Sequence, residues 1–140
     1  MAVDFKILRE RGLVVVCFSG HATIDEMVAA TKTYLSHPDY AKGQKQLVDL
    51  TDILSFEKDY VRFMNIQASK AERLAHIPGQ TIAVYLAPTP VSREVCAMFV
   101  RSWTEVGLVV PLVQNTEAEA LAILGQPETS IEMLFSLAAR

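Results

Sequence analysis

The run Leu13-Val14-Val15-Val16-Cys17-Phe18 places six apolar residues in succession, three of them valines. Both of its alternating sets of side chains are apolar, which is typical of a strand that is buried on both faces of a sheet. Two later segments have a similar character, Gln46–Leu50 (QLVDL) and Thr81–Ala87 (TIAVYLA). We therefore expect three buried strands in the middle of a sheet.

Two further strands carry the marks of sheet edges. Residues 2–9 alternate apolar with polar side chains, which indicates a strand with one exposed face. The turn Glu10-Arg11-Gly12 joins this strand to the run at 13–18 as a hairpin. The last predicted strand, 108–113 (LVVPLV), contains Pro111, which has no N–H to donate to a neighbouring strand. These two strands are therefore predicted at the two edges.

Three of the predicted helices have capping signals. Thr23 and Thr116 each precede a glutamate by three residues, which is the pattern of a capping box. Thr89 is followed by Pro90, whose missing N–H costs nothing in the first turn of a helix. Gly107 is expected to end the helix that begins there.

The remaining crossover helix is predicted from about Phe56 to His76, and Pro78-Gly79 ends it. Tyr60 and Met64 lie on a single apolar stripe of this helix, because four residues are about one turn. The stripe is expected to face the core.

Strands that alternate with helices pair in parallel through right-handed crossovers. The simplest arrangement is an α/β fold with a five-stranded mixed sheet in the order 1-2-3-4-5, only the first strand being antiparallel. Four crossover or flanking helices and a C-terminal helix complete it. Residues 1–126 are expected to form one domain. The apolar tail at 127–140, capped near Thr129, or another subunit is expected to cover the second sheet face.

Charge and composition exclude several classes of protein. The formal net charge is -3 and no basic run occurs, so we expect no binding to nucleic acid. The longest apolar run, 13–18, is too short to span a membrane. The N-terminus lacks the pattern of a signal peptide, which favours a cytoplasmic protein. Cys17 and Cys96 are expected to be reduced and to act as small apolar side chains.

Several short motifs occur together in a characteristic order. The layout around them resembles the SpoIIAA-like superfamily, which includes the STAS domains and the STAS/SEC14 group, over about residues 3–125. The motifs that carry the resemblance are Gly20 before a capped helix, then His37-Pro38-Asp39-Tyr40 with Gly43, then Leu47-Val48-Asp49-Leu50-Thr51-Asp52.

This resemblance implies a regulatory or protein-binding domain that is not an enzyme. STAS domains that antagonise anti-sigma factors carry a phosphorylated serine at the start of the second helix. In this chain the matching segment is 57–60 (EKDY), which contains no serine. The nearest serine, Ser55, is expected to be a helix N-cap. The resemblance therefore favours the fold and argues against the phosphorylation switch.

Three polar residues are candidates for chemistry. His21 follows the second strand, at the end of a parallel sheet where ligands bind. Asp49 lies inside an apolar strand, where a carboxylate needs a partner, and Asp52 follows it. The competing interpretation makes His21 an ordinary loop residue, and makes Asp49 a structural acceptor for backbone N–H groups at the exit of the strand.

Recognisable catalytic and cofactor motifs are missing from the sequence. There is no phosphate-binding glycine loop, no GxSxG elbow and no CxxC pair. No histidine or cysteine partner lies at metal-ligand spacing from His21. We therefore expect no catalytic residue, no cofactor and no metal.

Large apolar side chains provide a second set of candidates. They either fill the core or line a pocket, and a filled core is the simpler interpretation. The residues concerned are Tyr60, Met64, Tyr85, Met98 and Trp103.

Three hypotheses follow. The first is a non-catalytic STAS-like module that binds a protein partner or forms a homodimer. The second is a carrier or sensor of a small apolar or lipid-like ligand. The third is an enzyme that uses His21 and Asp49. A cavity would favour the second hypothesis, and an exposed apolar patch the first.

Overall fold

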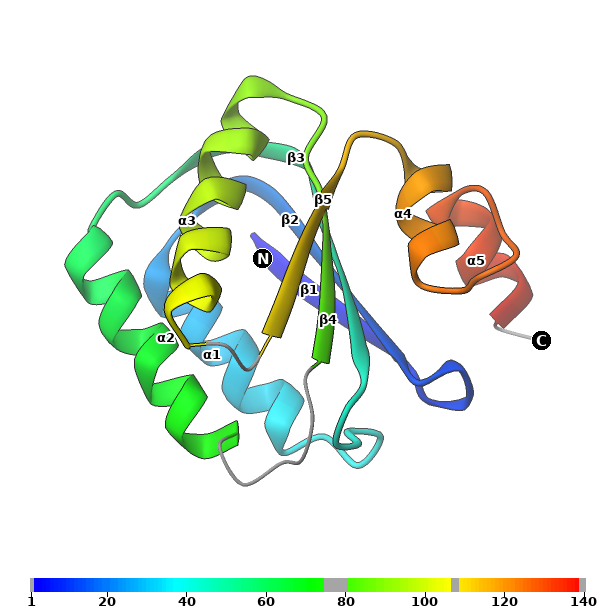
Figure 1. The fold of residues 1–140 in the computed structure, drawn as a ribbon, viewed down its shortest axis with the longest axis horizontal. Helices are drawn as coiled ribbons and strands as arrows, with labels where there is room; N and C mark the ends of the chain where they lie inside the picture. Colours follow the sequence, from blue (N-terminus) through cyan, green and yellow to red (C-terminus); the bar gives the residue numbers. More distant parts are fainter. Residues whose placement is uncertain (1, 75–80, 107–108, 139–140) are drawn as a thin grey trace.

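One five-stranded sheet runs through the molecule in the order β1-β2-β3-β4-β5 (Figure 1). The structure is a computed structural model, and it describes residues 2–74, 81–106 and 109–138. β1 is antiparallel to β2, and the other neighbours are parallel, so the predicted strand order and directions are confirmed. The strands are β1 Val3–Leu8, β2 Leu13–Ala22, β3 Lys45–Phe56, β4 Thr81–Leu86 and β5 Val109–Gln114.

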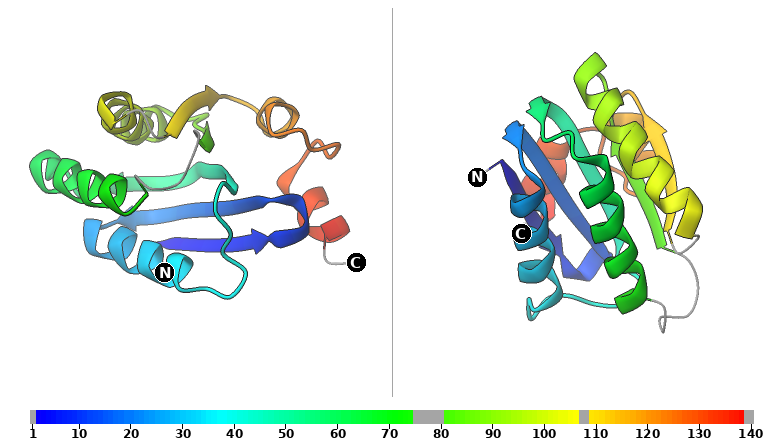
Figure 2. Two further views of the ribbon diagram at one scale, coloured as in Figure 1. Left: turned by 60° about the horizontal axis from the view of Figure 1, so that its bottom comes forward. Right: turned by 90° about the vertical axis from the view of Figure 1, so that its left-hand side faces the viewer.

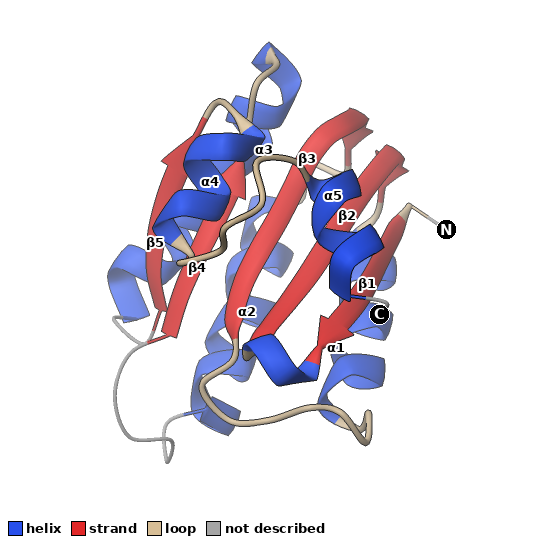
Figure 3. Cartoon of the chain, turned by 90° about the vertical axis from the view of Figure 1, so that its right-hand side faces the viewer, coloured by secondary structure: helices blue, strands red, loops and turns tan. Residues whose placement is uncertain are grey.

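Helices cover both faces of this sheet (Figures 2 and 3). α1 (Ile24–Leu35), α2 (Tyr60–Leu74) and α3 (Pro90–Val106) lie on one face. α4 (Glu117–Ile123) and α5 (Ile131–Ala138) lie on the opposite face. β5, which contains Pro111, is an edge strand as predicted.

The capping signals confirm the predicted helix starts. Thr23 Oγ1 accepts the N–H of Glu26, and Thr116 Oγ1 accepts the N–H of Glu119, each at 3.2 Å. The hydroxyl of Thr89 accepts the amide N–H three residues ahead at 3.0 Å. Each threonine thus satisfies one of the N–H groups that a helix leaves unpaired in its first turn.

The sheet separates two apolar cores. The core between the sheet and α4 and α5 is built from aliphatic side chains, and we call it the aliphatic core. Its buried members are Leu8, Leu13, Val15, Leu47, Val84, Leu86, Ala120, Leu121, Leu124, Ile131 and Leu134. The core beneath α1, α2 and α3 is rich in rings, and we call it the aromatic core. Its buried rings are Phe18, Phe56, Phe63, Tyr85, Phe99 and Trp103.

An ion pair between partly exposed Arg11 and buried Glu128 ties the segment between α4 and α5 to the hairpin of β1 and β2. Arg11 donates to Glu128, whose side chain is buried, and also to Gln126 Oε1 at 2.9 Å. The Arg11 side chain therefore holds α5 close to the sheet face on which Leu13 and Val15 lie.

β3 is longer than expected. Thr51 and Asp52 were predicted to end the strand, but it continues to Phe56, and β2 extends beside it to Ala22. Register shifts interrupt the ladder of these two strands, and Gly20 adopts a φ of +63° at one of them. Thr51 and Asp52 occupy exposed positions within the strand, which accounts for two polar residues there, and the chain does not turn at them.

α2 begins later than predicted, at Tyr60 and not at Phe56. Ser55 is not its N-cap, because Ser55 belongs to β3. Asp59 takes that position, where its carboxylate accepts the N–H of Arg62 at 3.1 Å. The predicted end at His76 and Pro78-Gly79 lies outside the described residues, as does Gly107.

The tail helix begins one residue later than expected. Ser130 Oγ, and not Thr129, accepts an N–H of its first turn, that of Met133 at 3.1 Å. β5 is likewise shifted by one residue at its end, to Gln114.

Candidate functional site

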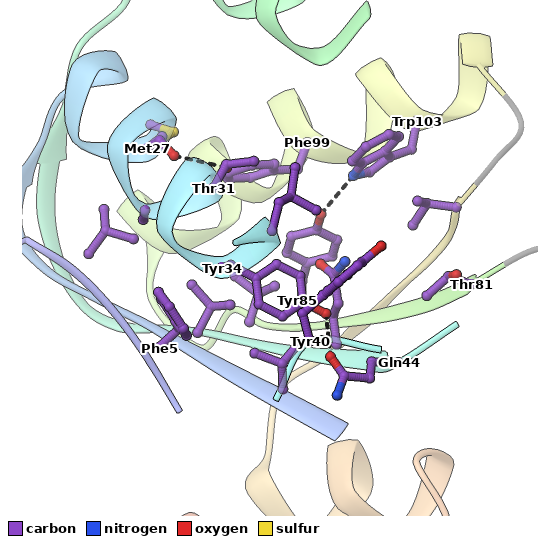
Figure 4. Close-up of a pocket in the computed structure, with 18 of the residues that line it drawn as sticks. Phe5, Met27, Thr31, Tyr34, Tyr40, Gln44, Thr81, Tyr85, Phe99 and Trp103 are labelled. Atoms are coloured by element: carbon purple, nitrogen blue, oxygen red, sulfur yellow. Dashed lines mark hydrogen bonds between the residues drawn. The ribbon is translucent and has the colours of Figure 1, made fainter. Parts of the chain in front are cut away.

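A partly open cavity of about 150 Å³ lies between the aromatic core and the segment that follows α1 (Figure 4). Its walls come from the sheet, α1, α2, α3 and the segment that follows α1. None of the described residues that line it is charged. The ring-bearing or polar members shown in Figure 4 are Phe5, Thr31, Tyr34, Tyr40, Gln44, Thr81, Tyr85, Phe99 and Trp103.

The periodicities of strand and helix place these walls. Val14, Val16 and Phe18 alternate along β2 and so share the cavity face of the sheet. Met27, Ala30, Thr31 and Tyr34 follow one another at helical spacing on α1 and face the same space. Small side chains such as Ala30 leave room between the strands and the larger rings.

A hydrogen-bonded pair of rings forms part of the cavity wall. Trp103 Nε1 donates to the hydroxyl oxygen of Tyr85 at 3.0 Å, and both side chains are buried. Burial raises the pKa of Tyr85 above its ordinary value, so the hydroxyl keeps its proton at neutral pH. Among the described residues this is the only hydrogen bond of that hydroxyl, so its proton stays available for donation.

A second tyrosine is held beside the segment that follows α1. The Tyr34 hydroxyl donates to Gln44 Oε1 at 2.6 Å, and Gln44 Nε2 donates to the carbonyl of Asp39 at 2.9 Å. Burial raises the pKa of Tyr34 as well. The Tyr34 ring meets Tyr40 edge-on, with ring centroids 5.0 Å apart. This cluster fixes the wall of the cavity near Gly43.

Gln67 is the exceptional polar residue of the site. Its side chain is only 1% exposed, and its Nε2 donates to Ser102 Oγ at 3.1 Å. Its Oε1 is buried and accepts no hydrogen bond within the described part of the chain. Leaving a buried acceptor unpaired costs about 1–3 kcal/mol. Gln67 is also one of the residues that line the cavity.

The apolar residues that the sequence suggested for one pocket lie at two separate sites in the structure. Tyr85 and Trp103 line the cavity, whereas Tyr60, Met64 and Met98 line a separate surface groove between α2 and α3. The stripe of Tyr60 and Met64 was expected to face the core. Met64 packs against the aromatic core, but Tyr60 is 50% exposed. Among the described side chains of α2, Phe63 and Gln67 are the buried ones, and they lie one helical turn apart.

This groove, which we call the α2–α3 groove, has a volume of about 580 Å³. Phe63 and Met98 are buried beneath it, whereas Val61 on its rim is 73% exposed. Glu94 and Arg101, both exposed, also line it. The groove is therefore apolar at its base and carries both signs of charge along α3.

The polar candidates lie elsewhere and have separate partners. His21 Nδ1 shares a hydrogen bond with Ser55 Oγ at 2.8 Å on exposed parts of β2 and β3. Asp49 Oδ1 accepts the N–H of Thr51 at 3.0 Å and its hydroxyl at 2.6 Å. Asp52 lies beside β2 further along β3. No hydrogen bond within the described residues joins His21 to Asp49, so their geometry offers no acid–base pair.

Asp49 has a local structural contact, although not the one expected at the exit of a strand. β3 continues past it, and its acceptor contacts stay within the strand, where the β2 ladder shifts register opposite it. The carboxylate therefore steadies an irregular part of the sheet.

Both cysteines are free thiols. Burial is the main cause that raises the pKa of Cys17 and of Cys96, each to about 11. They therefore stay protonated at neutral pH, and a protonated thiol is a poor nucleophile.

Two kinds of feature are missing from the described residues. These residues contain no cluster of three or more His, Cys, Asp or Glu side chains placed to hold a metal ion. The helices at 24–35, 60–74, 90–106, 117–123 and 131–138 do not include one with the length and apolarity needed to cross a membrane.

The comparisons with known proteins assign no family. No protein-family model matches the chain. A search of curated proteins gives no significant match. The resemblance to the SpoIIAA-like superfamily therefore stays a prediction, and any function has to be argued from the geometry above.

Proposed function

We propose that this chain is a non-catalytic carrier or sensor that binds a small, neutral, largely apolar molecule. The observation that carries the proposal is the cavity of about 150 Å³ beside the aromatic core. Apolar cavities of about this size bind molecules such as benzene. A ligand with roughly six to ten non-hydrogen atoms fits this space.

The lining favours a neutral ligand. The described lining residues include no charged side chain, so an ionised group would be buried without a counter-charge. Such burial costs several kcal/mol, and an ion would remain in water. Apolar walls with a few polar groups are typical of small-molecule sites.

Thermal unfolding with toluene tests this function. Toluene should raise the Tm of the protein, because a ligand of the native state at ten times its Kd adds about 1.4 kcal/mol of stability. The variant Ala30→Leu fills the cavity from α1 and should remove the rise. Ala29→Leu changes the exposed neighbour of the same helix and should keep it.

Two results would contradict the proposal. One is an unchanged Tm of the wild-type protein at saturating toluene. The other is an equal loss of the effect in Ala30→Leu and Ala29→Leu, since toluene would then act outside the cavity.

A second candidate function, protein binding through self-association, is favoured by the α2–α3 groove. Glu94 and Arg101 are seven residues apart on α3, which is about two helical turns, and both line the groove. If α3 packs antiparallel on α3 of a second copy, Glu94 meets Arg101 of the other chain twice, as two-fold symmetry requires. Exposed Tyr60 and Val61 would be buried in the same contact.

Charge reversal tests this candidate. Light scattering should report a dimer for the wild-type protein, a monomer for Glu94→Arg, and a dimer again for Glu94→Arg combined with Arg101→Glu. A wild-type protein that is monomeric at high concentration would exclude self-association by this groove.

A further inference from the structure

Two buried polar groups at the cavity have unused hydrogen-bonding capacity. Gln67 Oε1 can accept a hydrogen bond, and no described residue provides one. The Tyr85 hydroxyl accepts from Trp103 Nε1 and still has a proton to donate. Gln67 is 1% exposed and Tyr85 is 2% exposed, so bulk water does not satisfy either of them.

The surrounding contacts determine which atom of Gln67 is left to accept, and they hold the Tyr85 hydroxyl in place. Ser102 Oγ accepts from Gln67 Nε2 and donates to the carbonyl of Phe99 at 2.7 Å, which orients the amide. The nitrogen of Gln67 thus has a partner, and its oxygen is the side-chain atom that has none among the described residues. The Tyr85 ring is stacked on Phe99 with centroids 5.3 Å apart, which holds its hydroxyl in place.

We infer that the ligand of this cavity is a neutral hydroxyl compound, that is, a phenol or a small alcohol with a compact apolar body. The inference rests on the proposed function and adds the polarity of the ligand. A hydroxyl is the smallest neutral group that is both donor and acceptor. It can donate to Gln67 Oε1, and it can accept from the Tyr85 O–H.

Toluene and phenol form a matched pair of probes, because they share one ring and one substituent atom. Titration calorimetry at neutral pH should give a Kd for phenol roughly tenfold lower than that for toluene, as one hydrogen bond to a buried group provides. Anisole, which accepts but cannot donate, should bind more weakly than phenol.

Variants assign this preference to the amide oxygen. Gln67→Met removes the acceptor at similar volume, so toluene should then bind more tightly than phenol, whose hydroxyl proton would be buried without an acceptor. Asn65→Met removes an exposed amide of the same helix, in the α2–α3 groove and away from the cavity, and should keep the preference for phenol.

The outcomes separate the two proposals. Binding of neither probe would contradict the proposed function itself. If toluene binds as tightly as phenol in the wild-type protein, the cavity is still a binding site, but the inferred hydroxyl of the ligand is wrong. Ordered water would then be the partner of Gln67. An equal loss of preference in Gln67→Met and Asn65→Met would also overturn the inference, because the effect would then not depend on the amide at the cavity.

Discussion

The two faces of the sheet are built from the same strands but packed in different ways. On one face the aliphatic core is closed by α4 and α5, and Leu13, Leu121 and Leu134 are 0% exposed. On the other face the aromatic core borders a cavity of about 150 Å³. Most α/β domains of this size fill both faces, since interiors pack as densely as organic crystals.

The kind of side chain explains the difference. Leucine and isoleucine have several rotamers and can close gaps between a sheet and two short helices. In the aromatic core, Phe99 meets Phe18 and Phe63 edge-on and is stacked on Tyr85. Rings fixed against one another in this way cannot collapse into a neighbouring space. Rigid aromatic packing can therefore preserve a cavity where an aliphatic core would fill it.

The largest expected effect comes from truncating the two cores. Leu121→Ala should lower the free energy of unfolding by about 3–5 kcal/mol, because the filled core cannot relax into the space. Met27→Ala, at the cavity wall, should cost about 2 kcal/mol, because part of that side chain already faces empty space. Urea unfolding of both variants measures the two costs. Equal costs would mean that the two cores are equally well packed.

Enlarging a small residue should have opposite signs on the two faces. Ala120→Leu, in the filled core, should destabilise the protein by about 1–3 kcal/mol through overpacking. Ala30→Leu, at the cavity, should stabilise it by about 0.5–1.5 kcal/mol, as cavity-filling substitutions do. The midpoints of urea unfolding check this. If Ala120→Leu stabilises the protein, the predicted difference between the two cores is wrong.

The smallest effect concerns the thiols, one packed against each core. Cys96 lies in the aromatic core and Cys17 packs against the aliphatic core. Both have a pKa raised from 9.0 to about 11, mainly by burial. Because the raised pKa belongs to the folded state, their contribution to stability is complete below pH 9 and is lost as the pH rises towards 11.

Urea unfolding at pH 8, 9 and 10 measures this decline. The double variant Cys17→Ala with Cys96→Ala should lose less stability than the wild-type protein over the same pH range. An equally steep decline in the double variant would mean that the loss of stability comes from other groups, such as Tyr85, whose pKa is also raised by burial.

Much of the fold was predictable because its signals are local. Apolar runs such as 13–18 identified central strands, and the threonine caps placed helix starts to within one residue. Pro111 correctly marked an edge. The errors arose where polar residues have two interpretations. Thr51 and Asp52 looked like the end of a strand, but they are the exposed face of a longer one.

The candidate site was less accessible to sequence reasoning. Tyr85 and Trp103 were among the suggested residues, but Gln67 was not, although it is a polar residue one turn after buried Phe63. That position is the signal that could have identified it. The cavity itself depends on how rings from α1, α3 and the sheet meet, and no local pattern encodes such a long-range fit.

The sequential strand order also bears on how the chain folds as it is made. From β2 onward, each strand pairs with the strand synthesised just before it, so the sheet can grow in the direction of translation. Leu13, Val15 and Leu47 belong to early strands, but their cover includes α5, which is synthesised last. A nascent chain with a finished sheet therefore presents an unprotected aliphatic surface to water or to a chaperone. It becomes safe from aggregation only when Glu128 reaches Arg11 and the last helix docks.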